Sequence, residues 1–139
     1  MNPIKQESSM DTKEIGNLGE KIAQKYLRDR GYRILDENFH FRIPGSPQRA
    51  EIDIVAKKDD IVSFIEVKTL HNAEWSRIIS PEEKVDFFKR KKIVKAAEFW
   101  LIKNKMSLDS KWDLRVLSIR LDDVSGKAKI RYLKNLSLY

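Results

Sequence analysis

Length, composition and charge place this sequence among ordinary globular domains. The chain has 139 residues, of which 41% are hydrophobic and 35% are charged. This length suits one domain with its own core, and the composition excludes disordered and fibrous proteins. The absence of cysteine excludes disulfides and thiolate metal sites. No apolar run is long enough to span a membrane and residues 1–10 lack a signal-peptide pattern, so we expect a cytoplasmic protein with no membrane partner.

The net charge of +7 is concentrated in one part of the chain. Residues 84–105 contain eight basic and two acidic side chains, whereas residues 1–83 contain 13 basic and 15 acidic ones. A concentrated positive field favours a polyanionic partner, because binding releases counterions. A solvated, lysine-rich helix face explains the same charges, and charge alone favours this alternative.

The predicted elements follow the order α-β-β-β-α-β-β. After a polar, flexible arm at residues 1–11, apolar residues recur at helical spacing from about Thr12 to Arg30, and Gly31 ends this helix. A second helix begins at Ser80-Pro81, a cap followed by a proline in the first turn. Residues 12–139 then form one α/β domain around a mixed sheet, with the last strand at an edge. The further predicted ranges are strands 32–41, 49–56 and 61–69, helix 80–104, and strands 112–121 and 128–136. The predicted buried stripe of the second helix is Ile93, Ala96, Ala97, Trp100 and Leu101.

Charged residues interrupt the apolar hairpin at residues 51–68. A turn centred on Lys58-Asp59 pairs Glu51 with Glu66, and it places Asp53 diagonal to Glu66 on the same face. Strict alternation predicts that Ile52, Ile54 and Ala56 share one face of the second strand. Glu51, Asp53 and Val55 are then expected on the other face.

Two carboxylates on neighbouring strands repel each other unless a positive charge lies between them. A divalent cation with oxygen ligands, Mg²⁺ or Mn²⁺, is the simplest candidate. Lys68 follows Glu66 by two residues, about 7 Å along the same face, where its ammonium could stabilise charge on a phosphate. The backbone carbonyl of Val67 could supply another oxygen. A solvent-exposed face with a Glu66–Lys68 ion pair is the alternative, and the short pattern alone favours it. The apolar flanking residues favour the metal site.

The segment from residue 15 to residue 121 resembles a known family. Asp53, Glu66 and Lys68 in "EID" and "EVK" resemble the PD-(D/E)XK nuclease motif. The order and spacing of further segments are similar to the YraN-like family, an uncharacterised group similar to archaeal Holliday-junction resolvases. These segments are "GNLGEKIAQKYLRDRGYRIL", Asn38, "EIDIVA", "EVKT" and "WDLRV". The resemblance implies a restriction-endonuclease-like α/β core, which agrees with the element order.

The resemblance also implies roles for individual residues. Asp53 and Glu66 become metal ligands, and Lys68 becomes the catalytic lysine. Glu20 matches an acid of the first helix that related resolvases add to the metal site, and an ordinary surface glutamate is the alternative. Glu51 matches a family acid with an accessory role. The family pattern is altered at Ala50, Leu70 and Lys111.

Four residues are predicted to contact nucleic acid. Lys89 matches a family lysine that could reach a phosphate, and a stem that snorkels to solvent is an equal alternative. Arg90 and Lys92 share the basic helix that would hold the backbone. Trp75 is a candidate for stacking on a base. The implied partner is nucleic acid, with DNA favoured, and junction resolvases act as dimers, so a homodimer is among the implied arrangements.

Two functions fit these residues. The first is a metal-dependent nuclease, with a structure-specific DNA endonuclease of the junction-resolvase type, acting in repair or recombination, as its finer form. The alternative is a catalytically silent nucleic-acid-binding module on the same fold. The grouped acids favour the nuclease, because a binding module has no need to hold acids together.

Overall fold

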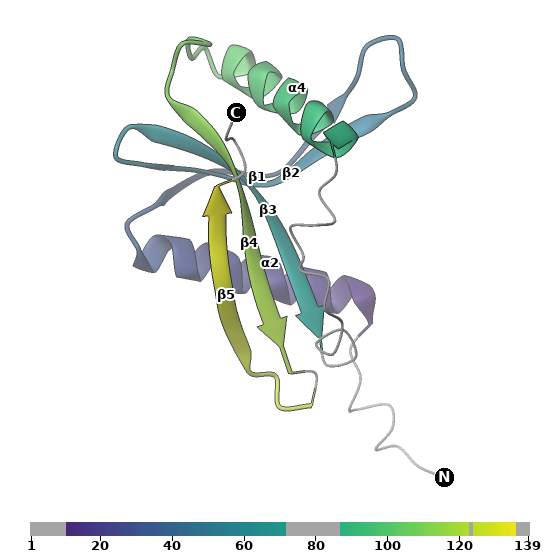
Figure 1. Ribbon diagram of the computed structural model, residues 1–139, viewed down its shortest axis with the longest axis vertical. Helices are drawn as coiled ribbons and strands as arrows, with labels where there is room; N and C mark the ends of the chain where they lie inside the picture. The colour runs from purple at the N-terminus through teal and green to yellow at the C-terminus, as the bar shows by residue number, and fades with distance from the viewer. Residues whose placement is uncertain (1–10, 72–86, 123, 136–139) are drawn as a thin grey trace.

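The computed structural model of the chain describes residues 11–71, 87–122 and 124–135, with the side chains at 71, 87–90 and 131–135 excepted (Figure 1). The elements are α2 (Thr12–Asp29), β1 (Arg33–Arg42), β2 (Arg49–Lys58), β3 (Ile61–His71), α4 (Phe87–Lys103), β4 (Trp112–Leu121) and β5 (Ala128–Asn135). Their order confirms the sequence prediction. The predicted start of the second helix, at Ser80, lies outside the described residues.

The five strands form one mixed sheet in the order β1-β2-β3-β4-β5. All neighbours are antiparallel except β3 and β4, which are parallel and are connected through α4. A parallel pair needs such a crossover, because a tight hairpin reverses the chain direction. The mixed sheet, with β5 at an edge, is the restriction-endonuclease-like arrangement that the resemblance predicted.

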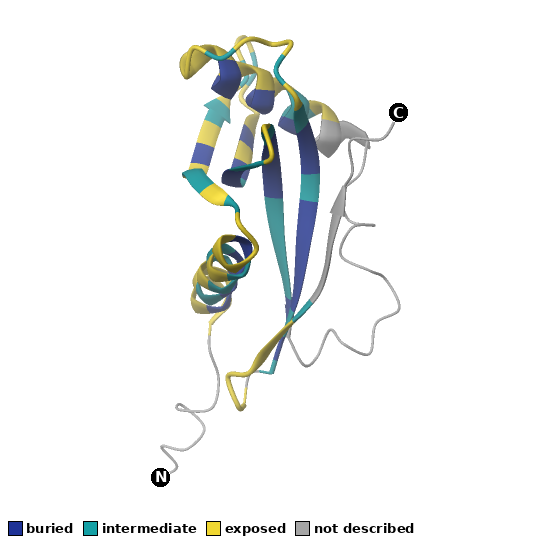
Figure 2. Cartoon of the chain, turned by 90° about the vertical axis from the view of Figure 1, so that its left-hand side faces the viewer, coloured by how far each residue is buried: buried dark blue, intermediate teal, exposed yellow. Residues whose placement is uncertain are grey.

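The two helices lie on opposite faces of the sheet. Figure 2 shows α4 at one end of the molecule and α2 further down, with buried residues along β3 and β4. The core beneath α2 contains Ala23, Leu27, Ile54, Ala56, Ile65, Leu117 and Ile119. The core beneath α4 contains the whole predicted stripe Ile93, Ala96, Ala97, Trp100 and Leu101, packed on Val55, Phe64 and Val116. Neither α2 nor α4, the helices of the described residues, is long and apolar enough to cross a bilayer.

Both ends of α2 are defined by local hydrogen bonds. The Asp11 side chain accepts from the Glu14 N–H at 2.7 Å and caps the first turn. At the other end Gly31 has φ 90°, as its predicted role requires. The Gly31 and Tyr32 N–H groups donate to the carbonyls of Arg28 and Leu27, which is a Schellman motif. The chain therefore enters β1 directly after the helix.

Close packing brings α2 against β3. Gly19 is buried, and a Cβ built on it would overlap the Oγ1 of Thr69. A Cβ built on Gly16, one turn earlier, would meet no atom within 4 Å. The contact at Gly19 therefore needs a glycine, and it sets how near the following residue, Glu20, lies to the sheet.

The turn between β2 and β3 differs from the prediction. Lys58 pairs with Ile61, so the turn contains Asp59 and Asp60 rather than being centred on Lys58-Asp59. Both turn residues have positive φ, 50° and 70°, as a two-residue type I′ turn requires. The predicted register is therefore wrong. The observed ladder ends at the pair Ile54–Ile65, so Asp53 and Glu66 lie just beyond it and the predicted pair Glu51–Glu66 does not form.

The predicted strict alternation along β2 is also wrong. Ile52 packs in the core beneath α4, whereas Ile54 and Ala56 pack in the core beneath α2. The switch occurs at Asp53, opposite Asn38 of β1, which has φ 51°. A left-handed residue disturbs the pleat of a strand, so side chains on either side of it turn to different faces.

Candidate active site at the divergence of two strands

The candidate site lies where β2 and β3 separate. Their ladder ends at the pair Ile54–Ile65, although β2 continues beside β1 and β3 continues beside β4. Just beyond this pair, the Val67 N–H donates to Asp53 Oδ2 at 2.7 Å. The carboxylate thus takes the place of the next backbone acceptor, and Asp53 is held rigidly in the opening between the strands.

Asp53 is an unusual carboxyl group because its surroundings disfavour its charge. Burial, together with the nearby carboxylates Glu20, Glu66 and Glu51, raises the pKa of Asp53 to about 7. The hydrogen bond from Val67 acts in the opposite direction, since it stabilises the ionised form. The Asp53 carboxyl therefore changes charge close to neutral pH unless a cation joins the site.

Glu20 reaches the site from α2, as predicted from the resemblance. It lines a hollow of about 210 Å³ together with Asp53, Val67 and Thr69. Burial and the charge of Glu51 raise the pKa of Glu20, while a hydrogen bond from the Asn38 side chain lowers it. Asn38, the residue of β1 with positive φ, thus also bonds to the Glu20 carboxylate.

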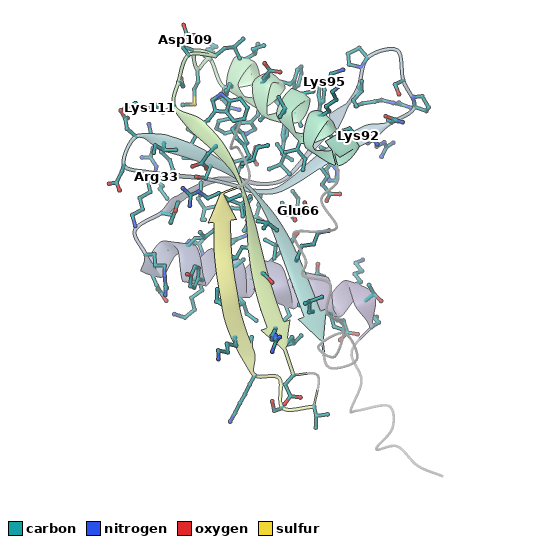
Figure 3. All side chains as sticks on the ribbon, in the orientation of Figure 1. Arg33, Glu66, Lys92, Lys95, Asp109 and Lys111 are labelled. Carbon is teal, nitrogen blue, oxygen red and sulfur yellow. The ribbon has the colours of Figure 1, made fainter. Side chains whose placement is uncertain are left out.

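Glu66 and Lys68 form an ion pair on β3, on either side of Val67 in the sequence. Their Oε1 and Nζ atoms are 3.0 Å apart, and the side chains are only 14% and 26% exposed. Along β3 they alternate with Val67, which packs toward α2, so they belong to the other face of the strand. Figure 3 shows Glu66 on β3, between the levels of α4 and α2. Acids therefore approach Asp53 from both faces of the sheet.

The structure brings five of the predicted site residues together. These are Asp53, Glu66, Lys68, Glu20 and the accessory Glu51, which all belong to one charge cluster. Among the described residues, however, no three acidic or histidine side chains converge in an arrangement that could hold a metal ion. The Val67 N–H contacts Oδ2 of Asp53 and Lys68 contacts Oε1 of Glu66, so each of these two contacts engages one oxygen of its carboxylate.

The chemistry of this cluster nevertheless fits a hard divalent cation. Its donors are carboxylate oxygens, the ligands that Mg²⁺ and Mn²⁺ prefer. The cluster contains four carboxyl groups and one ammonium, and the pKa of Asp53 is raised by its burial and then by its repulsion from Glu20, Glu66 and Glu51. A bound cation would compensate this repulsion. The Val67 carbonyl belongs to the same residue whose N–H already contacts Asp53.

The predicted nucleic-acid contacts are described only in part. Trp75 and the side chains of Lys89 and Arg90 lie outside the described residues. Lys92 lies on α4, where it lines a second hollow near the β1–β2 loop. Trp100, interpreted as a core residue, is 3% exposed, and its Nε1 donates to Asp36.

The structural role of Asn38 was missed by reasoning from the sequence. The residue was noted only as part of the resemblance, without a role. An asparagine is one of the few non-glycine residues that adopts positive φ readily, so its presence in the middle of a predicted strand was the available signal.

Comparison with known proteins links the chain to an uncharacterised group. Residues 19–125 match the model of the uncharacterised protein family UPF0102. A UPF0102 protein of Clostridium tetani is 43% identical over 68% of this chain and 70% of its own length. A second, of Clostridioides difficile, is 41% identical over 70% and 78%. A third, of Alkaliphilus oremlandii, is 35% identical over 88% and 97%.

Proposed function

This chain belongs to the uncharacterised protein family UPF0102, and we propose that it is a metal-dependent nuclease that hydrolyses phosphodiester bonds. One observation carries the proposal. The buried carboxyl of Asp53 has its pKa raised to about 7 in a cluster that holds three more carboxylates and the Glu66–Lys68 pair. Such uncompensated acids cost stability, and strongly shifted groups of this kind concentrate at functional sites.

The residues of the cluster have distinct proposed roles. Asp53, Glu66, Glu20 and the Val67 carbonyl would hold Mg²⁺ or Mn²⁺, which when bound supplies a nucleophilic water and neutralises charge on the phosphate. Lys68 would place its ammonium beside the phosphate oxygens, where charge develops during hydrolysis. Glu51 would add to the negative field that attracts the cation.

Two contacts support these roles by fixing positions. The Val67 N–H holds Asp53 on a central strand, where a side chain is placed more precisely than on a loop. Asn38 bonds to Glu20 and keeps it over the sheet. The cluster is thus built on α2, β2 and β3 together.

The finer proposal concerns the substrate. The resemblance to Holliday-junction resolvases supports branched DNA as substrate, and it supports a homodimer acting on the two symmetric strands. The basic residues of α4 would hold the phosphate backbone without reading bases.

Calorimetric titration with Mg²⁺ and Mn²⁺ tests the proposal, with wild type beside Asp53→Asn and Asp109→Asn. Asparagine at position 53 keeps an acceptor for Val67 N–H but removes the charge, so we expect metal affinity to fall at least about tenfold. The same samples are assayed on a four-way junction, a flap, a linear duplex and single strands of DNA and RNA. Metal-dependent cleavage should fall by about 10²-fold or more in Asp53→Asn. Asp109 is an exposed acid in the α4–β4 connection, so its variant should match wild type.

The catalytically silent binding module is the second candidate. One observation favours it: Glu66 already has a cationic partner in Lys68 at 3.0 Å, without any metal. Millimolar Mg²⁺ and Mn²⁺ that give no binding heat, together with intact salt-sensitive nucleic-acid binding, would establish this candidate and remove the nuclease.

A further inference from the structure

A row of basic and aromatic side chains lies outside the acidic cluster, between α4 and β1. We call it the α4–β1 seam. Its members on α4 are Lys92, Lys95, Phe99 and Lys103. The others are Phe39 and Phe41 of β1, and Ile43, which directly follows β1. Figure 3 shows Lys92 and Lys95 at the end of α4 beside the β1–β2 hairpin.

The aromatic centre of the seam is a small stack with one open ring. The ring centroids of Phe41 and Phe99 are 4.5 Å apart, and those of Phe39 and Phe99 are 6.4 Å apart. Phe39 is buried, whereas Phe99 is 42% exposed although it packs on Phe41. A phenylalanine that packs on neighbouring rings and is partly open to solvent is an apolar surface to which another flat ring can add.

Basic side chains lie on both sides of this stack. Lys95 and Lys103 are four residues before and four residues after Phe99, about 6 Å away in each direction along the helix axis. The Lys103 Nζ lies 5.6 Å from the centroid of Phe39, so this lysine packs against the aromatic group.

The other end of the seam opens into a hollow. Lys91, Lys92, Lys95, Ile43 and Gln48 line this space of about 260 Å³. In the described part of the chain, no acidic side chain lines it.

Two arginines of the β1–β2 hairpin add to the positive charge of the seam. Glu98, the acid of α4 next to Phe99 in the sequence, lies on a different side of the helix. Arg42 and Arg49 form a cross-strand pair at the base of the β1–β2 loop and are exposed. Glu98 of α4 immediately precedes Phe99, so it lies about 100° round the helix from the seam. The seam therefore carries an excess of positive charge.

We infer that the α4–β1 seam binds a single-stranded segment of nucleic acid, with a base stacked on Phe99 and flanking phosphates on Lys92, Lys95 and Lys103. Stacking needs a base whose face is free, and in a duplex both faces are covered by neighbouring bases. Aromatic side chains between lysines are the usual means of binding single strands without sequence preference. The inference rests on nucleic acid being the partner in the proposed function, and it adds that the partner carries unpaired nucleotides.

Fluorescence anisotropy with labelled dT15 and with a labelled 15-bp duplex tests the stacking contact. Measurements are made in EDTA, so that cleavage does not interfere. Phe99→Leu keeps an apolar side chain against Phe41 but removes the ring, and it should weaken dT15 binding at least about fivefold. Duplex binding should change less than twofold. Ile102→Ala is the matched control, because Ile102 is a 58% exposed apolar residue of the same helix outside the seam. It should bind as wild type does.

Salt dependence tests the phosphate contacts separately. Each lysine that neutralises a single-strand phosphate contributes about 0.7 to the slope of log K against log salt. Lys92→Gln and Lys95→Gln should each lower the dT15 slope by about this amount. Lys127→Gln makes the same charge change in the β4–β5 turn, at the opposite end of the molecule in Figure 1, and should leave the slope unchanged.

The inference is overturned if Phe99→Leu, shown to be folded by its thermal transition, binds dT15 within twofold of wild type. It is also overturned if wild type sediments as a dimer that Phe99→Leu dissociates, because the seam is then an interface between two copies. These outcomes leave the nuclease proposal standing if Asp53→Asn still abolishes metal-dependent cleavage. Conversely, loss of dT15 binding in Phe99→Leu supports the seam even where wild type cleaves nothing.

Discussion

Two acid-x-base pairs lie on the adjacent parallel strands β3 and β4, and their surroundings differ. Asp113 and Arg115 are on β4, where the guanidinium contacts both carboxylate oxygens at 3.0 to 3.2 Å. Asp113 is 6% exposed. Glu66 and Lys68 on β3 are joined by one contact at 3.0 Å and lie beside Asp53, whose pKa is raised partly by Glu20, Glu66 and Glu51.

The comparison separates a buried charge that has its own partner from a group of acids that outnumber their bases. The Asp113–Arg115 pair carries its own compensating cation in a two-point contact, as a buried carboxylate needs. The cluster around Asp53 has more acids than bases, so added protons or a bound cation would stabilise it. An acid and a base two residues apart on a strand can therefore form an isolated ion pair or part of an acidic cluster. The charges on neighbouring segments decide between the two.

The largest expected effect is on the pH dependence of stability at Asp53. The folded chain holds the Asp53 proton up to about pH 7, whereas the unfolded chain loses it near the ordinary value of 3.8. The stabilising contribution of this proton is complete below pH 4 and is lost as pH rises to about 7. Asp53→Asn removes this dependence, so its free energy of unfolding relative to wild type should rise between pH 4 and 8, by at most about 4 kcal/mol. Urea unfolding at several pH values measures it; a constant difference between the proteins would contradict the raised pKa.

The next effect concerns the pair on β4. Arg115→Met leaves Asp113 buried without its guanidinium, and we expect a loss of about 2–3 kcal/mol in the free energy of unfolding at pH 7. Adding Asp113→Leu should restore most of the loss, because both charges are then gone. Thermal and urea unfolding of the single and double variants measure this. A double variant as unstable as the single one would show that side-chain packing, not charge, sets the stability at this pair.

A smaller effect tests how α2 carries Glu20 to the cluster. Gly19→Ala forces α2 away from Thr69, and overpacking of this kind costs about 1–3 kcal/mol. Gly16→Ala is the matched control, because its Cβ meets nothing and alanine is the better helix former, so it should be neutral or stabilising by up to about 1 kcal/mol. Unfolding by urea compares the two. Equal stability would mean that the α2–β3 contact is not tight.

The smallest effect on stability, with a larger one on activity, is expected at Asn38. Asn38→Gly accepts φ 51° without strain but loses the bond to Glu20. Its stability should stay within about 1 kcal/mol of wild type, while metal affinity or cleavage falls about tenfold. Asn38→Ala loses the bond and adds backbone strain, so it should lower both the free energy of unfolding and the metal affinity. Metal titration and unfolding of the two variants separate these contributions; unchanged metal affinity in Asn38→Gly would remove Asn38 from the site.

Part of the candidate site was predictable from the sequence because it depends on short-range patterns. Asp53, Glu66 and Lys68 stand out as charges within apolar strands, and strand geometry alone places Glu66 and Lys68 side by side. Glu20 was predicted as a site residue only from the resemblance, because no short-range sequence pattern links a helix residue to a hairpin. The effect of Asn38 depends on its φ and on two distant partners, which no pattern encodes.

What the sequence by itself determined is the order of the elements, the ends of α2 and the buried stripe of α4. These follow from periodicity and capping, which act over a few residues. Only the tertiary structure decided the register of the hairpin, the change of face at Asp53 and the α4–β1 seam. The register depends on whether two aspartates both adopt positive φ. The change of face depends on a residue in the neighbouring strand, and the seam depends on where α4 crosses β1. Each of these is a contact between segments far apart in the chain, and its energy exists only once the sheet has formed.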